Sequence, residues 1–286
     1  MPRAALKALP FVLLAWIAAA AQAAPAATLN EHFEHTYPLA AGGTFALDNV
    51  NGEVAVTAWD RAEVRVTATK HVKAASEAHA KDLLKAIEIR VTPSPSEVKV
   101  ETRYPSAANG LLSWLTGGGS TDMSVSYLID VPRSAKLRVA TVNGAVGAHG
   151  TEGDARLKTV NGALLAADVR GALELSSVNG AISVTSAGGA VRASTTNGEI
   201  EVQLAALAPG ETAKLTSTNG AVTLRLPRDA RASLTARTVN GEIESGLPLT
   251  VHGKIGRRNH LEGELNGGGG KIEISTTNGG IRIGRM

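Results

Sequence analysis

The chain contains no cysteine among its 286 residues. This absence excludes a disulfide framework, a thiolate zinc site and a cysteine-linked lipid anchor. Aromatic residues amount to only 3% of the sequence, whereas glycine occurs 31 times. A large globular core uses more aromatic side chains, while a thin core of stacked aliphatic residues with tight glycine turns needs few. The composition therefore favours a thin aliphatic core.

The sequence also lacks a strong net charge. The formal charge is +3, but Arg3 and Lys7 precede a mostly apolar stretch and the small-x-small sequence Ala21-Gln22-Ala23. This pattern predicts a secretory signal peptide over residues 1–23, and hence export to the periplasm or cell surface. Without Arg3 and Lys7, 27 basic residues oppose 26 acidic ones, so we expect no nucleic-acid partner. No later stretch is apolar for long enough to predict a transmembrane segment in the mature chain.

One sequence motif occurs eight times: a β-branched residue, Asn-Gly, any one residue and then an aliphatic residue. The spacing is 18 residues from Asn143 to Asn197 and then loosens to 22, 21 and 38. A repeat of this length predicts an array in which each unit buries its apolar face against its neighbours. The asparagines are Asn51, Asn143, Asn161, Asn179, Asn197, Asn219, Asn240 and Asn278.

Polar and apolar residues alternate on both sides of each Asn-Gly pair, which predicts a strand, a corner and a second strand in every unit. A hairpin meander gives the same local pattern. A solenoid is favoured because its two strands cover each other, whereas a meander needs a second layer. We therefore expect an all-β protein, a β-solenoid of roughly 18–22-residue rungs. The aliphatic residues three positions after Asn are Val54, Val146, Leu164, Ile182, Ile200, Val222, Ile243 and Ile281.

In such a solenoid the eight asparagines form a structural ladder at one corner, with their side chains about 4.8 Å apart. A column of Ser and Thr, two residues before each later Asn, lies just inside it. Asn-Gly also suits positive φ angles, so we expect the corner asparagines to adopt the left-handed conformation.

Two segments interrupt the repeat. Residues 24–286 are expected to form a single domain, with a first rung over 43–60, an irregular cap over 61–131 and regular rungs over 132–286. The cap contains an amphipathic pattern that predicts a short helix over 74–86. Four apolar residues in a Gly-rich loop are expected to pack onto the cap, and the alternative is a hydrophobic lip for a partner or membrane surface: Leu111, Leu112, Trp114 and Leu115. The 38-residue gap before Asn278 predicts one degenerate rung within 246–271.

The sequence shows no catalytic constellation, and we predict neither an enzyme nor a cofactor. His32 and His35 have no obvious further metal ligand. The pairs Glu199/Glu201 and Glu242/Glu244 are expected two rungs apart, roughly 10 Å, which is too far to share one calcium ion.

One column of charged side chains is a candidate anion-binding site. Five residues before Asn lie, on successive rungs, Arg138, Arg156, Glu174, Arg192 and Lys214. They are predicted to point outward as a stripe about 19 Å long. The simpler interpretation is a solvated charge ladder neutralised in part by Glu174. The alternative is an anion-binding track for an acidic polysaccharide or another envelope component, formed by the four cations.

The repeat resembles that of the bacterial putative-adhesin family of β-strand-repeat domains of unknown function. The matching residues are the [Ser/Thr]-[Val/Thr]-Asn-Gly-x-[Ile/Val] units from Thr141 to Ile281, the segment Phe45–Asp60 ending in Thr-Ala-Trp-Asp, and Val131-Pro132. The resemblance covers nearly the whole mature chain. It implies an exported or envelope-associated β-helical protein with no established catalytic residues.

Three functions remain open at this point. The leading hypothesis is a non-catalytic, exported, adhesin-like protein that binds or scaffolds at the cell envelope. A carbohydrate-active β-helix enzyme, a lyase or hydrolase of acidic glycans, is the alternative. A structural protein that assembles end to end through its rungs is the third.

Overall fold

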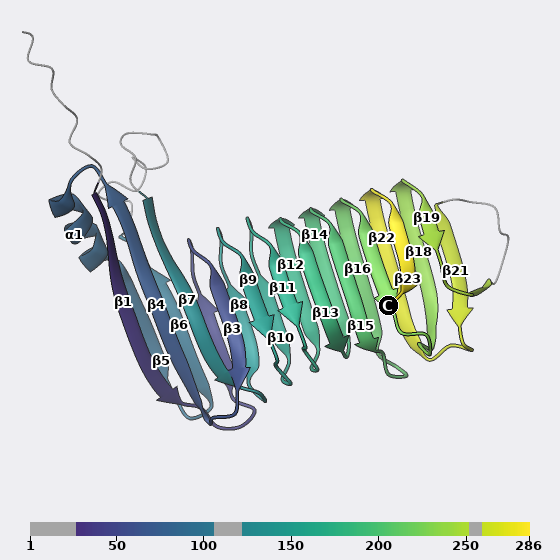
Figure 1. Ribbon diagram of the computed structural model, residues 1–286, viewed down its shortest axis with the longest axis horizontal. Helices are drawn as coiled ribbons and strands as arrows, with labels where there is room; N and C mark the ends of the chain where they lie inside the picture. Colours follow the sequence, from purple (N-terminus) through teal and green to yellow (C-terminus); the bar gives the residue numbers. More distant parts are fainter. Residues whose placement is uncertain (1–26, 106–121, 252–258) are drawn as a thin grey trace, which may run out of the picture.

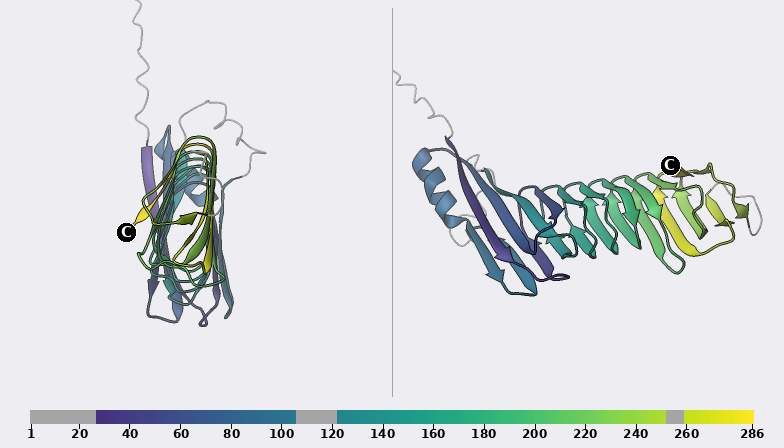
Figure 2. Two further views of the ribbon diagram at one scale, coloured as in Figure 1. Left: turned by 90° about the vertical axis from the view of Figure 1, so that its right-hand side faces the viewer. Right: turned by 60° about the horizontal axis from the view of Figure 1, so that its bottom comes forward.

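The computed structural model describes residues 27–105, 122–251 and 259–286, and these form 23 strands and one helix. The strands build an elongated stack (Figure 1). Two sheets run the length of the stack and face each other as narrow walls (Figure 2). The predicted all-β solenoid is confirmed. The predicted signal peptide and Leu111, Leu112, Trp114 and Leu115 lie outside the described residues.

We call the two walls sheet 1 and sheet 2, and give their strands in spatial order. Sheet 1 contains β1 (Ala27–Pro38), β4 (Glu63–Ala74), β7 (Asp122–Pro132), β3 (Val54–Trp59), β9 (Val146–His149), β11 (Leu164–Ala167), β13 (Ile182–Gly188), β15 (Ile200–Ala206), β17 (Val222–Leu226), β23 (Ile281–Arg285) and β19 (Ile243–Ser245). Sheet 2 contains β20 (Thr250–Val251), β21 (His260–Leu265), β18 (Ala232–Asn240), β22 (Gly270–Asn278), β16 (Thr212–Asn219), β14 (Val191–Asn197), β12 (Leu173–Asn179), β10 (Ala155–Lys158), β8 (Lys136–Ala140), β2 (Thr44–Asp48), β6 (Glu97–Arg103) and β5 (Glu88–Pro93).

Each regular rung is one repeat unit. The chain runs along a strand of sheet 2, turns at Asn-Gly and returns along a strand of sheet 1. Successive units pair in parallel and in register, so that Leu175 of β12 lies between Leu157 of β10 and Ala193 of β14. Leu175 and Ile182, on the two strands of one rung, are both at most 1% exposed. The aliphatic columns therefore form the thin core that the composition predicts.

The amino-terminal end is more regular than its sequence indicates. Strands β6 and β7 pair in parallel with β2 and β3, so they add a rung inside the predicted cap. Beyond it, β4 and β1 extend sheet 1 in antiparallel fashion, and β5 extends sheet 2. The predicted helix is α1 (Glu77–Ala86), whose Ser76 cap accepts a hydrogen bond from the His79 amide. This helix packs against β1 and β4. No helix in the described ranges is long and apolar enough to cross a membrane.

At the carboxy-terminal end, the structure differs from the predicted rungs in two ways. Residues 246–271 do not contain a degenerate rung, because β21 runs antiparallel to β18 and β20 pairs with β21. The last unit, β22–β23, is inserted between the β16–β17 rung and the β18–β19 rung. The rungs therefore do not follow the order of the sequence at this end (Figure 1).

Candidate anion-binding face

The corner asparagines lie in one column, joined by amide–amide hydrogen bonds. Each Nδ2 donates to the Oδ1 of the asparagine one rung earlier in space, at 2.7–2.8 Å. The spatial order places Asn278 between Asn219 and Asn240. At the amino-terminal end, Asn51 donates to the Met123 carbonyl at 3.3 Å. This column holds neighbouring corners in register.

The Ser and Thr residues two positions before Asn form a buried second column. Thr159 donates to the Gly144 carbonyl at 3.0 Å, and Thr195 donates to the Gly180 carbonyl at the same distance. Each hydroxyl therefore satisfies a corner carbonyl that faces the inside of the stack. Equivalent bonds from Ser177, Ser217, Thr238 and Thr276 continue along the array.

The expectation of left-handed asparagines was wrong. In the described part of the chain only Asp168, Ser186 and Asn266 have positive φ among residues other than glycine. Asn179 instead ends strand β12. The Asn-Gly corner needs glycine for space, because a Cβ at Gly180 would overlap the backbone carbonyl of Gly162 on the next rung.

The charged column occupies the outer face of sheet 2. Arg156 lies directly between Arg138 and Glu174, and Arg192 lies between Glu174 and Lys214. The inserted strand β22 then places Glu273 beside Lys214. The five positions thus lie on successive strands, and Glu273 adds an acidic end to the stripe.

The ion pairs within this column divide its cations into two groups. Arg156 contacts Glu174 at 2.5 Å, and Lys214 contacts Glu273 at 3.4 Å. Lys271 contacts the same Glu273 at 2.6 Å. Within the described residues, Arg138 and Arg192 form no ion pair. Two arginines on the stripe therefore keep all their donors available to a ligand.

A shallow groove of about 540 Å³ runs over the part of this column from Arg138 to Arg192. Four basic and two acidic side chains line it, together with Thr212 and alanine, leucine and valine residues of the same rungs. One acidic lining residue, Asp154, accepts a hydrogen bond from the Ala172 amide at 3.0 Å, so it is held against the backbone. The charged lining residues are Lys136, Arg138, Asp154, Arg156, Glu174 and Arg192.

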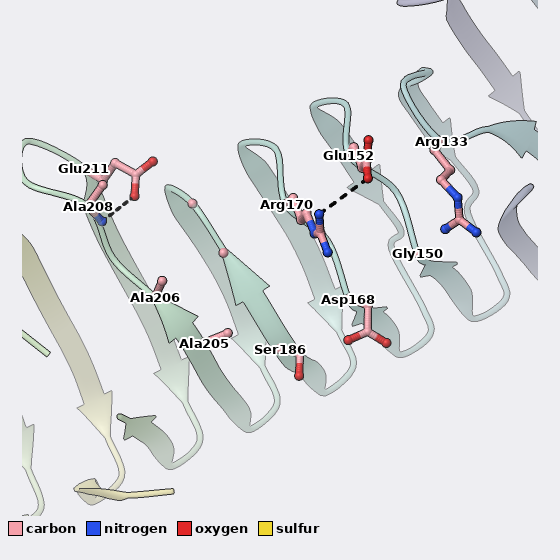
Figure 3. Close-up of a pocket in the computed structure, with 12 residues that line it drawn as sticks. Arg133, Gly150, Glu152, Asp168, Arg170, Ser186, Ala205, Ala206, Ala208 and Glu211 are labelled. Carbon is pink, nitrogen blue, oxygen red and sulfur yellow. Dashed lines mark hydrogen bonds and ion pairs between the residues drawn. The ribbon is translucent and has the colours of Figure 1, made fainter. Parts of the chain in front are cut away.

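A second groove, of about 630 Å³, follows the glycine corners at the other edge of the stack. Figure 3 shows Arg170 directed toward Glu152, and their charged groups lie 3.6 Å apart. Arg133, at the end of this groove, binds Asp60 at 2.6 Å and holds the pKa of that carboxyl below its usual range. Because these arginines already have acidic partners, this groove is a weaker candidate for anion binding.

The acidic pairs lie farther apart than the sequence predicts. Strand β23 is inserted between β17 and β19, so three rung steps separate Glu201 from Glu244, roughly 14 Å. Glu201 pairs with Arg225, and Glu244 pairs with Arg282. Across the described ranges, no group of three or more acidic or histidine side chains could hold a metal ion. His32 instead bonds to Thr69 Oγ1 at 3.1 Å.

Ionisable side chains at the end of the stripe and in the core have pKa values shifted by their surroundings. A hydrogen bond from Lys271 lowers the pKa of Glu273, and Lys214 contributes in the same direction. Burial raises the pKa of Tyr127 to about 12, and its hydroxyl bonds to Thr102 at 2.6 Å in the core. Burial also raises the pKa of Tyr104, which donates to the Asn51 carbonyl at 3.0 Å. No sequence pattern indicated these contacts, of which the Tyr104–Asn51 bond holds the first Asn-Gly corner.

A comparison with solved structures finds proteins of low sequence identity to this chain. A putative cell adhesion protein from Clostridium sporogenes is 12% identical, covering 90% of this chain and 100% of its own, with a TM-score of 0.38. A putative adhesin from Bacteroides fragilis is 11% identical, covering 90% and 97%, with a TM-score of 0.40. A putative lipid binding protein from Parabacteroides distasonis is 10% identical, covering 90% and 96%, with a TM-score of 0.32.

A comparison with curated proteins finds no match. A comparison with family models finds one that spans residues 44–284, from the start of β2 into β23. That span contains all eight Asn-Gly corners and the charged column. The chain belongs to the Toastrack DUF4097 family.

Proposed function

We propose that this protein is an exported, non-catalytic binding protein whose sheet 2 face engages a linear anionic polymer, an acidic polysaccharide of the cell envelope. The observation that carries this proposal is the groove over β8, β10, β12 and β14, in which Arg138 and Arg192 have no acidic partner among the described residues. The pattern of residues 1–23 supports export.

The spacing of the cations suits a repeating ligand. Arg138 and Arg156 lie one rung apart at one end of the stripe, and Arg192 and Lys214 lie one rung apart at the other. At about 4.8 Å per rung, the whole stripe is about 19 Å long. An extended polymer with regularly placed carboxylates can contact both ends, and the guanidinium fork of Arg binds carboxylates in bidentate fashion.

Glu174 sets the affinity of this face. It holds Arg156 and places a negative charge at the centre of the stripe. Removal of that charge frees Arg156 and removes a repulsion. Glu174→Gln should therefore bind an anionic polymer more tightly than the unmodified protein.

The test is calorimetric titration with polygalacturonate at several salt concentrations, with neutral dextran as the control ligand. The double variant Arg138→Ser/Arg192→Ser should bind at least about tenfold more weakly and show a flatter salt dependence. Arg225→Ser is the matched control, because Arg225 lies on sheet 1 and is similarly exposed. Equal losses in both variants, or no binding at low salt, would refute the proposed site. Release of shortened polysaccharide would instead show a carbohydrate-active enzyme.

A further inference from the structure

Strand β1 is a long edge strand with one open side. Among the described residues it pairs only with β4, through twelve residues from Ala27 to Pro38. Figure 1 shows it near one end of the stack, with α1 beside its start. Unpaired N–H and C=O groups along such an edge can bind another strand.

The two faces of β1 differ. Residues opposite the buried Val72, Ala68 and Val64 of β4 point toward the core side, and the intervening residues point outward. On the core side, Leu29, Phe33 and Tyr37 are only half-buried, although they pack against the core. An additional strand beside β1 would cover the remaining exposed surface of these side chains.

We infer that β1 pairs antiparallel with β1 of a second copy of this chain, about a two-fold axis that passes through Phe33. A symmetric pair must place side chains of directly opposed residues on the same face of the continuous sheet. The axis therefore passes through a residue rather than between two residues. This requirement excludes every register centred between two residues.

The sequence of β1 is complementary to itself in the register centred on Phe33. On the core side, Glu31, which also binds Lys70 of β4 at 2.8 Å, lies opposite His35 of the second copy, and Phe33 lies opposite Phe33. On the outer side, His32 lies opposite Glu34 of the second copy. Each Glu–His pair occurs twice by symmetry, so the register contains four pairs in which a carboxylate can accept a hydrogen bond from a histidine ring.

The neighbouring registers lack this complementarity. An axis through His32 opposes His32 to itself and Glu31 to Phe33. An axis through Glu34 opposes Glu34 to itself, and like charges directly opposite destabilise a strand pair. The register centred on Phe33 also pairs Leu29 with Tyr37, so the half-buried apolar residues of the core side meet one another.

The assembly would be an end-to-end dimer in which the two copies of sheet 1 form one continuous wall through their β1 strands. Because β1 lies at the end of the stack, the second copy extends away from the first. The longest dimension of the particle should be nearly twice that of one chain. Small-angle scattering and sedimentation equilibrium both measure this difference.

The absence of cysteine permits a direct test of the register. An Asn30→Cys variant mixed with a Thr36→Cys variant should form a mixed disulfide under mild oxidation, because these two exposed positions are directly opposed. Neither variant alone should cross-link to itself, since residues six apart along a strand lie about 20 Å from each other. Efficient self-cross-linking of either single variant would overturn the register.

A charge exchange provides a second test on the exposed outer face. Glu34→Lys should weaken the dimer about tenfold, because two symmetry-related pairs lose their acceptor together. Adding His32→Glu restores opposite charges across the axis and should restore the dimer. Thr28→Lys, near the end of the strand, is the control and should change dimerisation little. A chain that remains monomeric at high concentration, or a dimer unaffected by Glu34→Lys, would refute the inference.

Discussion

The close approach of the corner glycines predicts a large effect from a single methyl group. Gly180→Ala places a Cβ against the Gly162 carbonyl and near the Ser177 hydroxyl. The obstacle is backbone on a neighbouring rung, so a side-chain rotation cannot relieve it. The corner must move away, which weakens the Ser177–Gly162 hydrogen bond of 3.2 Å and the Asn179–Asn161 bond of 2.8 Å. Overpacking and these two bonds together should reduce the free energy of unfolding by about 2–4 kcal/mol.

Gly147→Ala is the matched control. Gly147 lies in strand β9, and a Cβ there meets no atom within 4 Å. This change should alter the free energy of unfolding by less than about 0.5 kcal/mol, or raise it slightly through lower entropy of the unfolded chain. Urea denaturation followed by circular dichroism compares the two variants, provided that their m-values agree. If both variants unfold within about 0.5 kcal/mol of each other, the space argument for the corner glycine is wrong.

Two further outcomes follow from the side chains around the core. Asn179→Ala removes the amide hydrogen bonds to Asn161 and Asn197 and should lower the free energy of unfolding by about 1–2 kcal/mol. The control Ser183→Ala, on the outward face, should have almost no effect. Equal urea midpoints for the two variants would argue against the asparagine ladder. The pKa of Glu273 is lowered in the folded protein, so its stabilising contribution is complete above the ordinary value of 4.5 and is lost as pH falls through the lowered value. The stability difference between the protein and Glu273→Gln should therefore shrink on acidification, and a constant difference down to low pH would contradict this assignment.

The repeat motif was sufficient to predict the architecture because every unit places the same residue types at the same positions. An aliphatic column and an Asn column both require neighbours one rung away, so the pattern specifies stacking. The outward direction of Arg138 and its neighbours follows from the same alternation. These features depend on local periodicity, which sequence reports well.

The order of the last rungs could not be predicted from this pattern. Strands β18 and β22 present equivalent residues to their neighbours, since Leu234 and Ile272 both pack in the core and Asn240 and Asn278 both continue the ladder. Either strand would satisfy β16, and the sequence contains no local signal that chooses between them. The strand β1 was also missed, because only Leu29, Phe33 and Tyr37 mark its core side and polar residues separate them.

The insertion of β22–β23 has a consequence for biosynthesis. A polypeptide leaves the ribosome amino terminus first, and the rungs up to β16–β17 can stack in the order in which they emerge. The β18–β19 unit is synthesised before the β22–β23 unit, yet it takes a place beyond it. A stack that closed early, with β18 directly on β16, would have to reopen to admit residues 270–285. The native order of rungs can therefore form only after residues 270–285 have emerged, although the β18–β19 unit emerges earlier.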